Sequence, residues 1–157
     1  MMTPKEISQL FTEKGRTLGC AESFTGGLFA QQITSIPGAS HFFKGGLITY
    51  STEEKARILG ISYDLIDSHG VVSQEIAQEM ASHARQLLNV DYCVSFTGNA
   101  GPTAMDNKPV GEVYIAVACY DLVVVTKHNL AGSRSEIQNQ AVDIACQLLY
   151  ELLQQKN

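Results

Sequence analysis

Apolar residues recur every three or four positions in several stretches of the chain, and this spacing predicts helices with one buried face. One such stretch follows Ser73, a residue type that favours the N-cap, and ends near Leu88. Its apolar positions are Ile76, Ala77, Met80, Ala84, Leu87 and Leu88. Other helices are predicted over residues 4–14, about 25–35, 52–59, about 63–69 and about 133–153.

Capping signals support two of these helices. Thr3-Pro4-Lys5-Glu6 is a capping box with proline at the first helical position, and Gly15 closes that helix. Ser51 and Glu54 form a second capping box, which opens a short helix that ends at Gly60. These boundaries rest on local chemistry as well as on periodicity.

Short runs rich in β-branched and aromatic residues lie between the helices and predict strands. The first covers about Thr17–Glu22, the second is GGLITYS at 45–51, and the third is DYCVSFT at 91–97. The segment EVYIAVACYDLVVVTKHNL at 112–130 predicts two strands that form a hairpin around Tyr120-Asp121.

Strands and helices therefore alternate along most of the chain, which indicates a sheet covered by helices on both faces. We predict an α/β fold: a three-layer α/β/α sandwich with a mixed, roughly five-stranded sheet, mostly parallel with one antiparallel strand. The 157 residues suit one domain, 1–157. Ligands of such sheets bind where parallel strands end. Ser23, Tyr50 and the loop after Thr97 all lie at predicted strand ends.

Composition restricts the class of protein. The net charge is −5 and no lysine or arginine cluster exists, which argues against a nucleic-acid or membrane-surface partner. The longest apolar runs have strand length and are too short to span a bilayer. The N-terminus has no basic segment followed by an apolar one, so no secretory signal is predicted and a cytoplasmic location is expected.

The cysteines and histidines do not have the spacing of a metal site. Cys20, Cys93, Cys119 and Cys146 form no C-x-x-C pair, and each lies in an apolar run, which predicts buried free thiols. The histidines show neither H-x-H nor H-x-x-x-H spacing. No metal and no cofactor are expected.

Ser23 in AESFTGG is the candidate nucleophile, because it stands between a predicted strand and a predicted helix. Gly26 and Gly27 let the main chain approach a ligand closely. The first N–H groups of the helix are then available for a phosphate or an oxyanion. The alternative is that Ser23 only caps the helix.

Lys55 is the candidate base. Tyr50 ends its strand and Lys55 falls in the first turn of the next helix, where the helix dipole and burial both lower the pKa of a lysine. The spacing allows the phenol and the amine to meet. The alternative is a surface lysine beside a half-buried tyrosine. A histidine base, as in a Ser-His-Asp triad, is the other option. No histidine stands at a strand end beside a plausible acid; His69 and His128 come nearest, and the alternative for each is an exposed loop or cap residue.

Two further segments suggest ligand contacts. The loop TGNAGP at 97–102 offers turns and main-chain donors near the same sheet edge, and its alternative is a structural loop. Arg134 in AGSR stands at a helix start and suits an anion, and its alternative is a solvated charge.

Taken together and in this order, these motifs resemble the CinA C-terminal domain family, which includes nicotinamide-nucleotide amidases. The matching segments are AESFTGG, GLITYSTEEK, GVVS, TGNAGP, KPVG and GSR, and the resemblance runs from about Lys5 to Leu153. It implies an α/β/α fold and a cofactor-free hydrolysis of nicotinamide mononucleotide to nicotinate mononucleotide and ammonia. Longer relatives carry an N-terminal domain that resembles molybdopterin-binding proteins, which is not expected within these residues.

The resemblance also implies a Ser-Tyr-Lys catalytic set, which here is Ser23, Tyr50 and Lys55. Lys55 is then the ultimate base, and Tyr50 relays or positions the proton. The expected substrate contacts are Thr25, Gly26, Gly27, Thr97, Gly98, Ala100, Gly101 and Arg134. The expected partner is a small nucleotide substrate, and a homo-oligomer, dimer or higher, is expected.

Three departures from the family pattern concern the substrate. Phe24 replaces a cysteine, and Thr103-Ala104-Met105 replaces a Gly-rich stretch. In AGSR, Ser133 stands where the family has an aspartate, and Gln138, four residues after Arg134, replaces a second arginine. They predict weaker binding of the mononucleotide. They also favour an alternative function, a weak or inactive paralogue that binds nucleotides or regulates. A structural role linked to competence or DNA damage is a third hypothesis. The acidic composition of the chain does not support direct binding to DNA.

Overall fold

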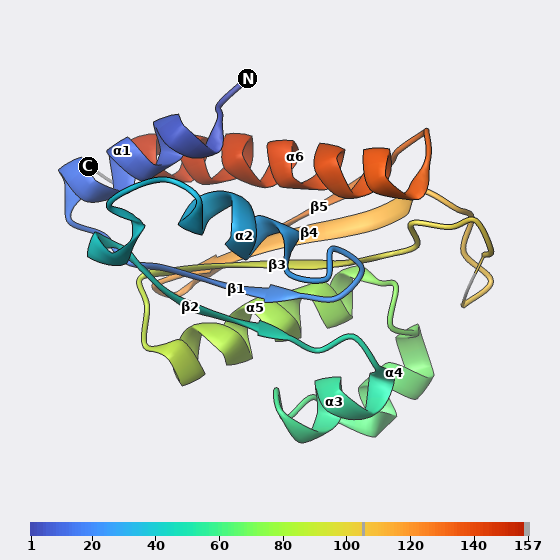
Figure 1. The fold of residues 1–157 in the computed structure, drawn as a ribbon. Helices are drawn as coiled ribbons and strands as arrows, with labels where there is room; N and C mark the ends of the chain where they lie inside the picture. Colours follow the sequence, from blue (N-terminus) through green and yellow to red (C-terminus); the bar gives the residue numbers. More distant parts are fainter. Residues whose placement is uncertain (105, 156–157) are drawn as a thin grey trace.

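A twisted five-stranded sheet forms the centre of the computed structural model, which describes residues 1–104 and 106–155. The strand order is β2-β1-β3-β4-β5. The strands are β1 (Leu18–Glu22), β2 (Phe43–Ile48), β3 (Tyr92–Gly98), β4 (Glu112–Cys119) and β5 (Leu122–Asn129). Figure 1 shows the sheet between two layers of helices, which confirms the predicted three-layer α/β/α sandwich.

The direction of the strands matches the prediction of one antiparallel strand. β1 pairs in parallel with β2 on one side and with β3 on the other. β4 pairs antiparallel with β3 and with β5, so β4 alone runs against the rest. Strands β1, β2 and β3 therefore end at the same edge, and the segments that follow them meet there.

Helices cover both faces of the sheet (Figure 1). On one face lie α1 (Pro4–Lys14), α2 (Leu28–Thr34) and α6 (Arg134–Gln155). On the other lie α3 (Thr52–Arg57), α4 (Tyr63–His69) and α5 (Gln74–Leu88). A short 3₁₀ turn at Ala39–His41 leads from α2 to β2, and its Ala39 packs into the core under α1, α2 and α6. Within the described residues, no helix is long and apolar enough to cross a membrane.

Side chains that alternate along the strands fill two hydrophobic cores. Val94 and Phe96 of β3 join the core under α1, α2 and α6, whereas Cys93 joins the core under α5. This alternation is what a strand covered on both faces requires. All four cysteines are buried thiols that form no disulfide, as predicted.

Helix boundaries follow the capping chemistry in most cases. Thr3 and Glu6 form the predicted capping box, and Gly15 ends α1 in the left-handed region. Ser51 and Ser73 each accept a main-chain N–H at the start of α3 and α5. The predicted capping box at Ser51 is only half formed, because the Glu54 carboxylate binds Arg57 instead of the Ser51 N–H.

Two predicted boundaries were wrong. α2 begins at Leu28 rather than near Thr25, because Gly26 and Gly27 have φ of 60° and 103° and cannot belong to a right-handed helix. β2 covers 43–48 rather than 45–51, so Tyr50 lies beyond the strand in the turn that leads to α3.

Candidate active site

Ser23 lies directly after the end of β1, in the turn that leads to α2. Its main-chain N–H donates to the Phe96 carbonyl, and its own carbonyl accepts from Gly26 N–H. The residue is 8% exposed. Ser23 is therefore not the N-cap of α2, a position that Gly27 occupies, and the capping alternative is wrong.

Lys55 reaches Ser23 from α3, which begins after the Ser51 cap. The Lys55 side chain is 1% exposed, and its Nζ donates to Ser23 Oγ at 2.9 Å. The same Nζ donates to the main-chain carbonyl of Thr49 at 2.8 Å and to that of Tyr50 at 3.3 Å. The surface-lysine alternative is therefore wrong as well.

Burial lowers the pKa of Lys55 from 10.5 to about 8, because desolvation penalises the ammonium form, and the Asp106 carboxylate offsets part of this effect. Once Lys55 is neutral, two N–H bonds can face the two carbonyls while the lone pair faces Ser23 Oγ. The geometry therefore suits direct proton transfer from the serine to the amine.

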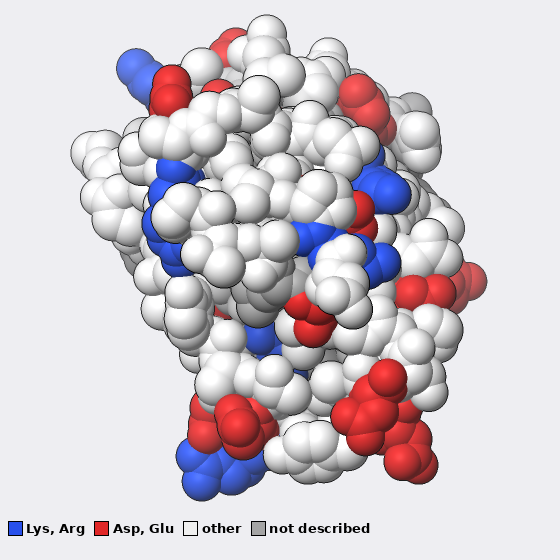
Figure 2. Space-filling view, turned by 90° about the vertical axis from the view of Figure 1, so that its right-hand side faces the viewer, with Lys and Arg blue, Asp and Glu red and all other residues white. Residues whose placement is uncertain are grey.

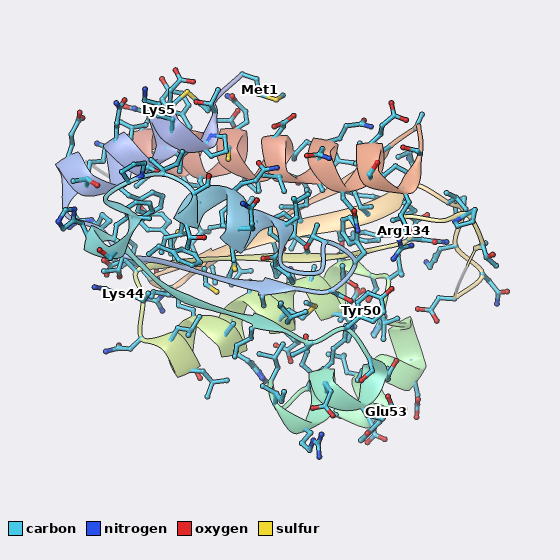
Figure 3. The ribbon with its side chains drawn as sticks, viewed as in Figure 1. Met1, Lys5, Lys44, Tyr50, Glu53 and Arg134 are labelled. Atoms are coloured by element: carbon cyan, nitrogen blue, oxygen red, sulfur yellow. The ribbon has the colours of Figure 1, made fainter. Side chains whose placement is uncertain are left out.

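The Tyr50 phenol does not lie between Ser23 and Lys55. Its side chain is 61% exposed, and its hydroxyl accepts a hydrogen bond from Arg134 Nη2 at 2.9 Å. Arg134 also donates from Nη1 to the Gly101 carbonyl at 2.6 Å. Figure 3 shows the two labelled side chains, from the β2–α3 turn and from the start of α6, at the same end of the molecule. The expected proton relay through the phenol is absent, because Lys55 contacts Ser23 directly.

A pocket of about 350 Å³ opens beside Ser23. Six of the expected site residues line it: Ser23, Tyr50, Gly98, Ala100, Gly101 and Arg134. Phe24, Asn99, Pro102, Thr103 and Ala104 complete the lining, whereas Met105 lies outside the described residues. Lys55 lies beneath Ser23 and does not line the pocket.

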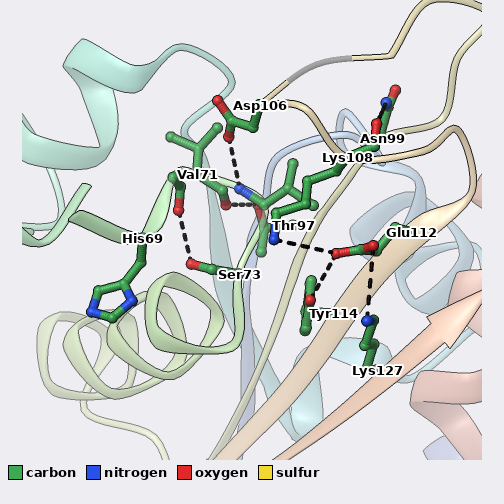
Figure 4. A network of polar contacts seen from close by, with 12 residues as sticks. His69, Val71, Ser73, Thr97, Asn99, Asp106, Lys108, Glu112, Tyr114 and Lys127 are labelled. Carbon is green, nitrogen blue, oxygen red and sulfur yellow. Dashed lines mark hydrogen bonds and ion pairs between the residues drawn. The ribbon is translucent and has the colours of Figure 1, made fainter. Parts of the chain in front are cut away.

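Four expected substrate contacts lie outside this lining. Thr97 is buried and its hydroxyl donates to the Val71 carbonyl at 2.6 Å, so it anchors the segment before α5 (Figure 4). Thr25 is also buried, at 3% exposure, and its hydroxyl has no partner among the described residues. Gly26 and Gly27 supply the left-handed turn before α2.

Two main-chain N–H groups at the start of α2 already have a partner within the chain. Glu22 is fully buried, and its two carboxylate oxygens accept from Phe29 N–H and Ala30 N–H at 3.0 Å each. The expectation that the first N–H groups of this helix bind a phosphate or an oxyanion is therefore wrong for those two groups, because a carboxylate of the chain holds them.

Sequence reasoning missed Glu22, Asn99, Asp106 and the contact of Gln138. The Asn99 carboxamide donates to the Lys108 carbonyl and accepts from Gly101 N–H, which shapes the loop. Gln138 donates to the Phe24 carbonyl at 2.8 Å and does not line the pocket. The sequence could have indicated the role of Glu22, because this acid stands directly before a Gly-rich turn that leads into a helix.

Charge around the pocket is mixed. Figure 2 shows the end of the molecule that carries it, with carboxylates gathered at the bottom of the view, over α3 and α4. These helices carry Glu53, Glu54, Asp64 and Asp67. Lysine and arginine side chains are scattered over this face, near its middle, at its upper left and beside the carboxylates at its lower left. Arg134 is the only cation among the described residues that line the pocket.

A larger groove of about 610 Å³ lies between α1 and the connection from α2 to β2. It is at the opposite end of the sheet, where β2 begins. Its lining includes Lys5, Glu13 and His41 but no buried pair of polar side chains in contact. The smaller pocket is therefore the better candidate site, because it contains the Ser23–Lys55 contact.

Comparison with known proteins identifies the family. A sequence model of the CinA C-terminal domain matches residues 2–153. The chain belongs to the CinA C-terminal domain family. A competence-damage inducible protein of Halothermothrix orenii is 45% identical over 152 residues, which cover 96% of this chain and 37% of the relative. The corresponding protein of Bacillus subtilis strain 168 is 40% identical, covering 97% of this chain and 36% of the relative. This CinA-family chain thus spans just over a third of the length of the curated relatives it matches.

The fold of this CinA-family chain has solved counterparts of similar length. A CinA superfamily protein from Klebsiella pneumoniae superposes with a TM-score of 0.94 at 27% identity, and the match covers 97% of this chain and 96% of that one. The Ser23–Lys55 pair therefore lies on an architecture that the CinA superfamily shares.

Proposed function

We propose that this chain is a serine amidohydrolase that converts nicotinamide mononucleotide and water to nicotinate mononucleotide and ammonia. The observation that carries the proposal is the buried contact of 2.9 Å between Lys55 Nζ and Ser23 Oγ at the floor of a pocket. A serine needs a base to become a nucleophile, and a desolvated lysine is one. The substrate is proposed because the family that the chain belongs to includes nicotinamide-nucleotide amidases.

Each step of the proposed reaction uses these two side chains. Ser23 Oγ attacks the carboxamide carbon while its proton passes to Lys55 Nζ. The C–N bond then breaks, and ammonia leaves with that proton. Water hydrolyses the resulting ester, again with Lys55 as the base, and releases Ser23. Glu22 holds the N–H groups of residues 29 and 30, and Gly26 N–H already donates to the Ser23 carbonyl. The donors we propose for the oxyanion are therefore the main-chain N–H groups of Phe24 and Thr25, directly after the nucleophile.

Arg134 and Tyr50 are the proposed contacts for the charged part of the substrate. Both side chains line the pocket and are hydrogen-bonded to each other. A guanidinium is well suited to a phosphate. The weaker mononucleotide binding expected from the family departures, and the homo-oligomer, stay predictions.

One assay tests the function directly: ammonia release from nicotinamide mononucleotide by the purified chain with EDTA present. The product should be nicotinate mononucleotide in equal amount, identified by mass or NMR. Saturable binding of the mononucleotide without any product would instead support the nucleotide-binding paralogue.

We expect kcat/KM to rise with pH to a plateau, with a midpoint near the Lys55 pKa of about 8. The reason is that only the neutral amine accepts the serine proton, so activity falls about tenfold per pH unit below the midpoint. Initial rates from about pH 6 to about pH 10 measure the profile. A flat profile across that range would contradict Lys55 as the base.

Tyr50→Phe should raise KM roughly tenfold and leave kcat within about threefold of the wild type, because the phenol contacts Arg134 and not the Ser23–Lys55 pair. Steady-state kinetics separate the two constants. Tyr63→Phe, at a similarly exposed tyrosine on α4, is the matched control. A loss confined to kcat would contradict this assignment and would support a role of the Tyr50 phenol in proton transfer.

A further inference from the structure

Glu22 is a buried carboxylate held by main-chain N–H groups. It is 0% exposed, and no lysine or arginine in the described part of the chain forms an ion pair with it. Its partners are Phe29 N–H and Ala30 N–H in the first turn of α2, each at 3.0 Å, and Cys20 Sγ at 3.6 Å. Burying a carboxylate is costly unless hydrogen bonds compensate, and unpaired N–H groups at a helix start are suitable donors.

The main chain of the same residue ties Ser23 to Lys55. The Glu22 carbonyl accepts from Thr49 N–H at 3.0 Å. The Thr49 carbonyl then accepts from Lys55 Nζ at 2.8 Å. Ser23 follows Glu22 directly and is fixed to β3 through its own N–H. Residue 22 is thus linked to the turn that carries the nucleophile and to the segment that carries the base.

We infer that Glu22 is a positioning residue: its carboxylate ties the 23–27 turn to the start of α2 and so holds Ser23 Oγ in contact with Lys55 Nζ. The glycines explain why such a tie is needed. Gly26 and Gly27 have φ of 60° and 103°, and glycine leaves the turn more conformational freedom than other residues would. The two hydrogen bonds that the N–H groups of residues 29 and 30 donate to the Glu22 carboxylate span the turn and remove that freedom. The inference rests on the proposed function.

Glu22→Gln is the sharpest test, because it keeps the size of the side chain and removes one acceptor. The glutamine oxygen can accept from one of the two N–H groups, while its NH₂ group faces the other and cannot accept. We expect kcat to fall roughly 10- to 100-fold through misplacement of Ser23, with KM nearly unchanged because Arg134 and Tyr50 are not affected. Glu22→Asp keeps two acceptor oxygens on a shorter side chain and should recover part of kcat.

Two NMR measurements do not depend on the substrate. Hydrogen exchange at the amides of Phe29 and Ala30 should accelerate in Glu22→Gln. The titration midpoint of Lys55, followed at its Cε, should move from about 8 toward the ordinary value as the turn loosens and water reaches the amine. These readouts separate the two proposals: an inactive wild type with both shifts would overturn the substrate but support the positioning role.

Glu6→Gln is the matched control. Glu6 also accepts a main-chain N–H at a helix start, that of Thr3, but it is exposed and far from the pocket. It should leave kcat and the Lys55 midpoint unchanged. Wild-type kcat, exchange and Lys55 midpoint in Glu22→Gln would overturn the inference. If Glu22→Gln does not fold, Glu22→Asp is measured instead, and we expect kcat, amide exchange and the Lys55 midpoint to lie between the wild-type values and those of a loosened turn. Wild-type values for all three in Glu22→Asp would then overturn the inference.

Discussion

Ser23→Ala should abolish amide hydrolysis, with a loss of turnover on the order of 10⁴- to 10⁶-fold. The Oγ removed is the atom that contacts Lys55 Nζ at the floor of the pocket, and no other hydroxyl among the described residues contacts this amine. Ammonia release measures the loss. Binding of nicotinamide mononucleotide should persist, because Arg134 and Tyr50 are untouched.

Ser95→Ala is the control for this variant. Ser95 is also a buried serine, on β3, but its hydroxyl donates to the carbonyl of Ala77 in α5 and does not line the pocket. Its removal should lower stability by about 1 kcal/mol and leave turnover unchanged. Hydrolysis that survives in Ser23→Ala would rule out the serine mechanism.

Lys55→Met should reduce turnover nearly as far as Ser23→Ala does. Methionine keeps the length of the side chain but cannot accept a proton. Because the two residues act as one unit, the double variant should be little worse than either single variant. Losses that multiply instead would assign Lys55 a separate role, such as holding substrate.

The same variant should change how stability depends on pH. The pKa of Lys55 is lowered to about 8 in the folded chain, whereas an unfolded lysine keeps its proton up to about pH 10.4. Between these values the unfolded state binds more protons, so wild-type stability rises with pH. Below about pH 8 the folded state holds Lys55 as a buried ammonium, which lowers the free energy of unfolding by about 3 kcal/mol. The stability of the wild type relative to Lys55→Met should therefore rise by about 2.5 kcal/mol between about pH 7 and about pH 10.

Chemical denaturation at several pH values measures this gain. Lys44→Met, at an exposed lysine on β2, is the matched control and should show no comparable trend. A constant difference between wild type and Lys55→Met across the range would mean that Lys55 does not titrate near pH 8 in the folded protein.

The fold could be predicted from the sequence because its signals are local. The capping box at Thr3, the N-cap at Ser73 and the hairpin at Tyr120-Asp121 each depend on residues a few positions apart. Strand and helix periodicities then imply a covered sheet, and the parallel order places three strand ends together. The errors fell at 25–28 and 45–51, where glycine conformation and pairing between strands set the boundaries.

The candidate site could be predicted only in part. Motif and resemblance indicated Ser23, Lys55 and the loop at 98–101, and the structure brings them together. It places Thr25, Gly26, Gly27 and Thr97 outside the pocket lining, because side-chain and turn contacts within the fold already use them or bury them.

The sequence by itself determined the order of elements, the edge at which a site forms and the residue types available there. Only the tertiary structure decided that Lys55 Nζ meets Ser23 Oγ across 32 positions of the chain, that the Tyr50 phenol turns to Arg134, and that Glu22 fills the start of α2. Hydrophobic period and capping act over a few residues, so a sequence displays them directly. The direction of a side chain and the depth of its burial depend on neighbours from distant segments, which exist only once the sheet has formed.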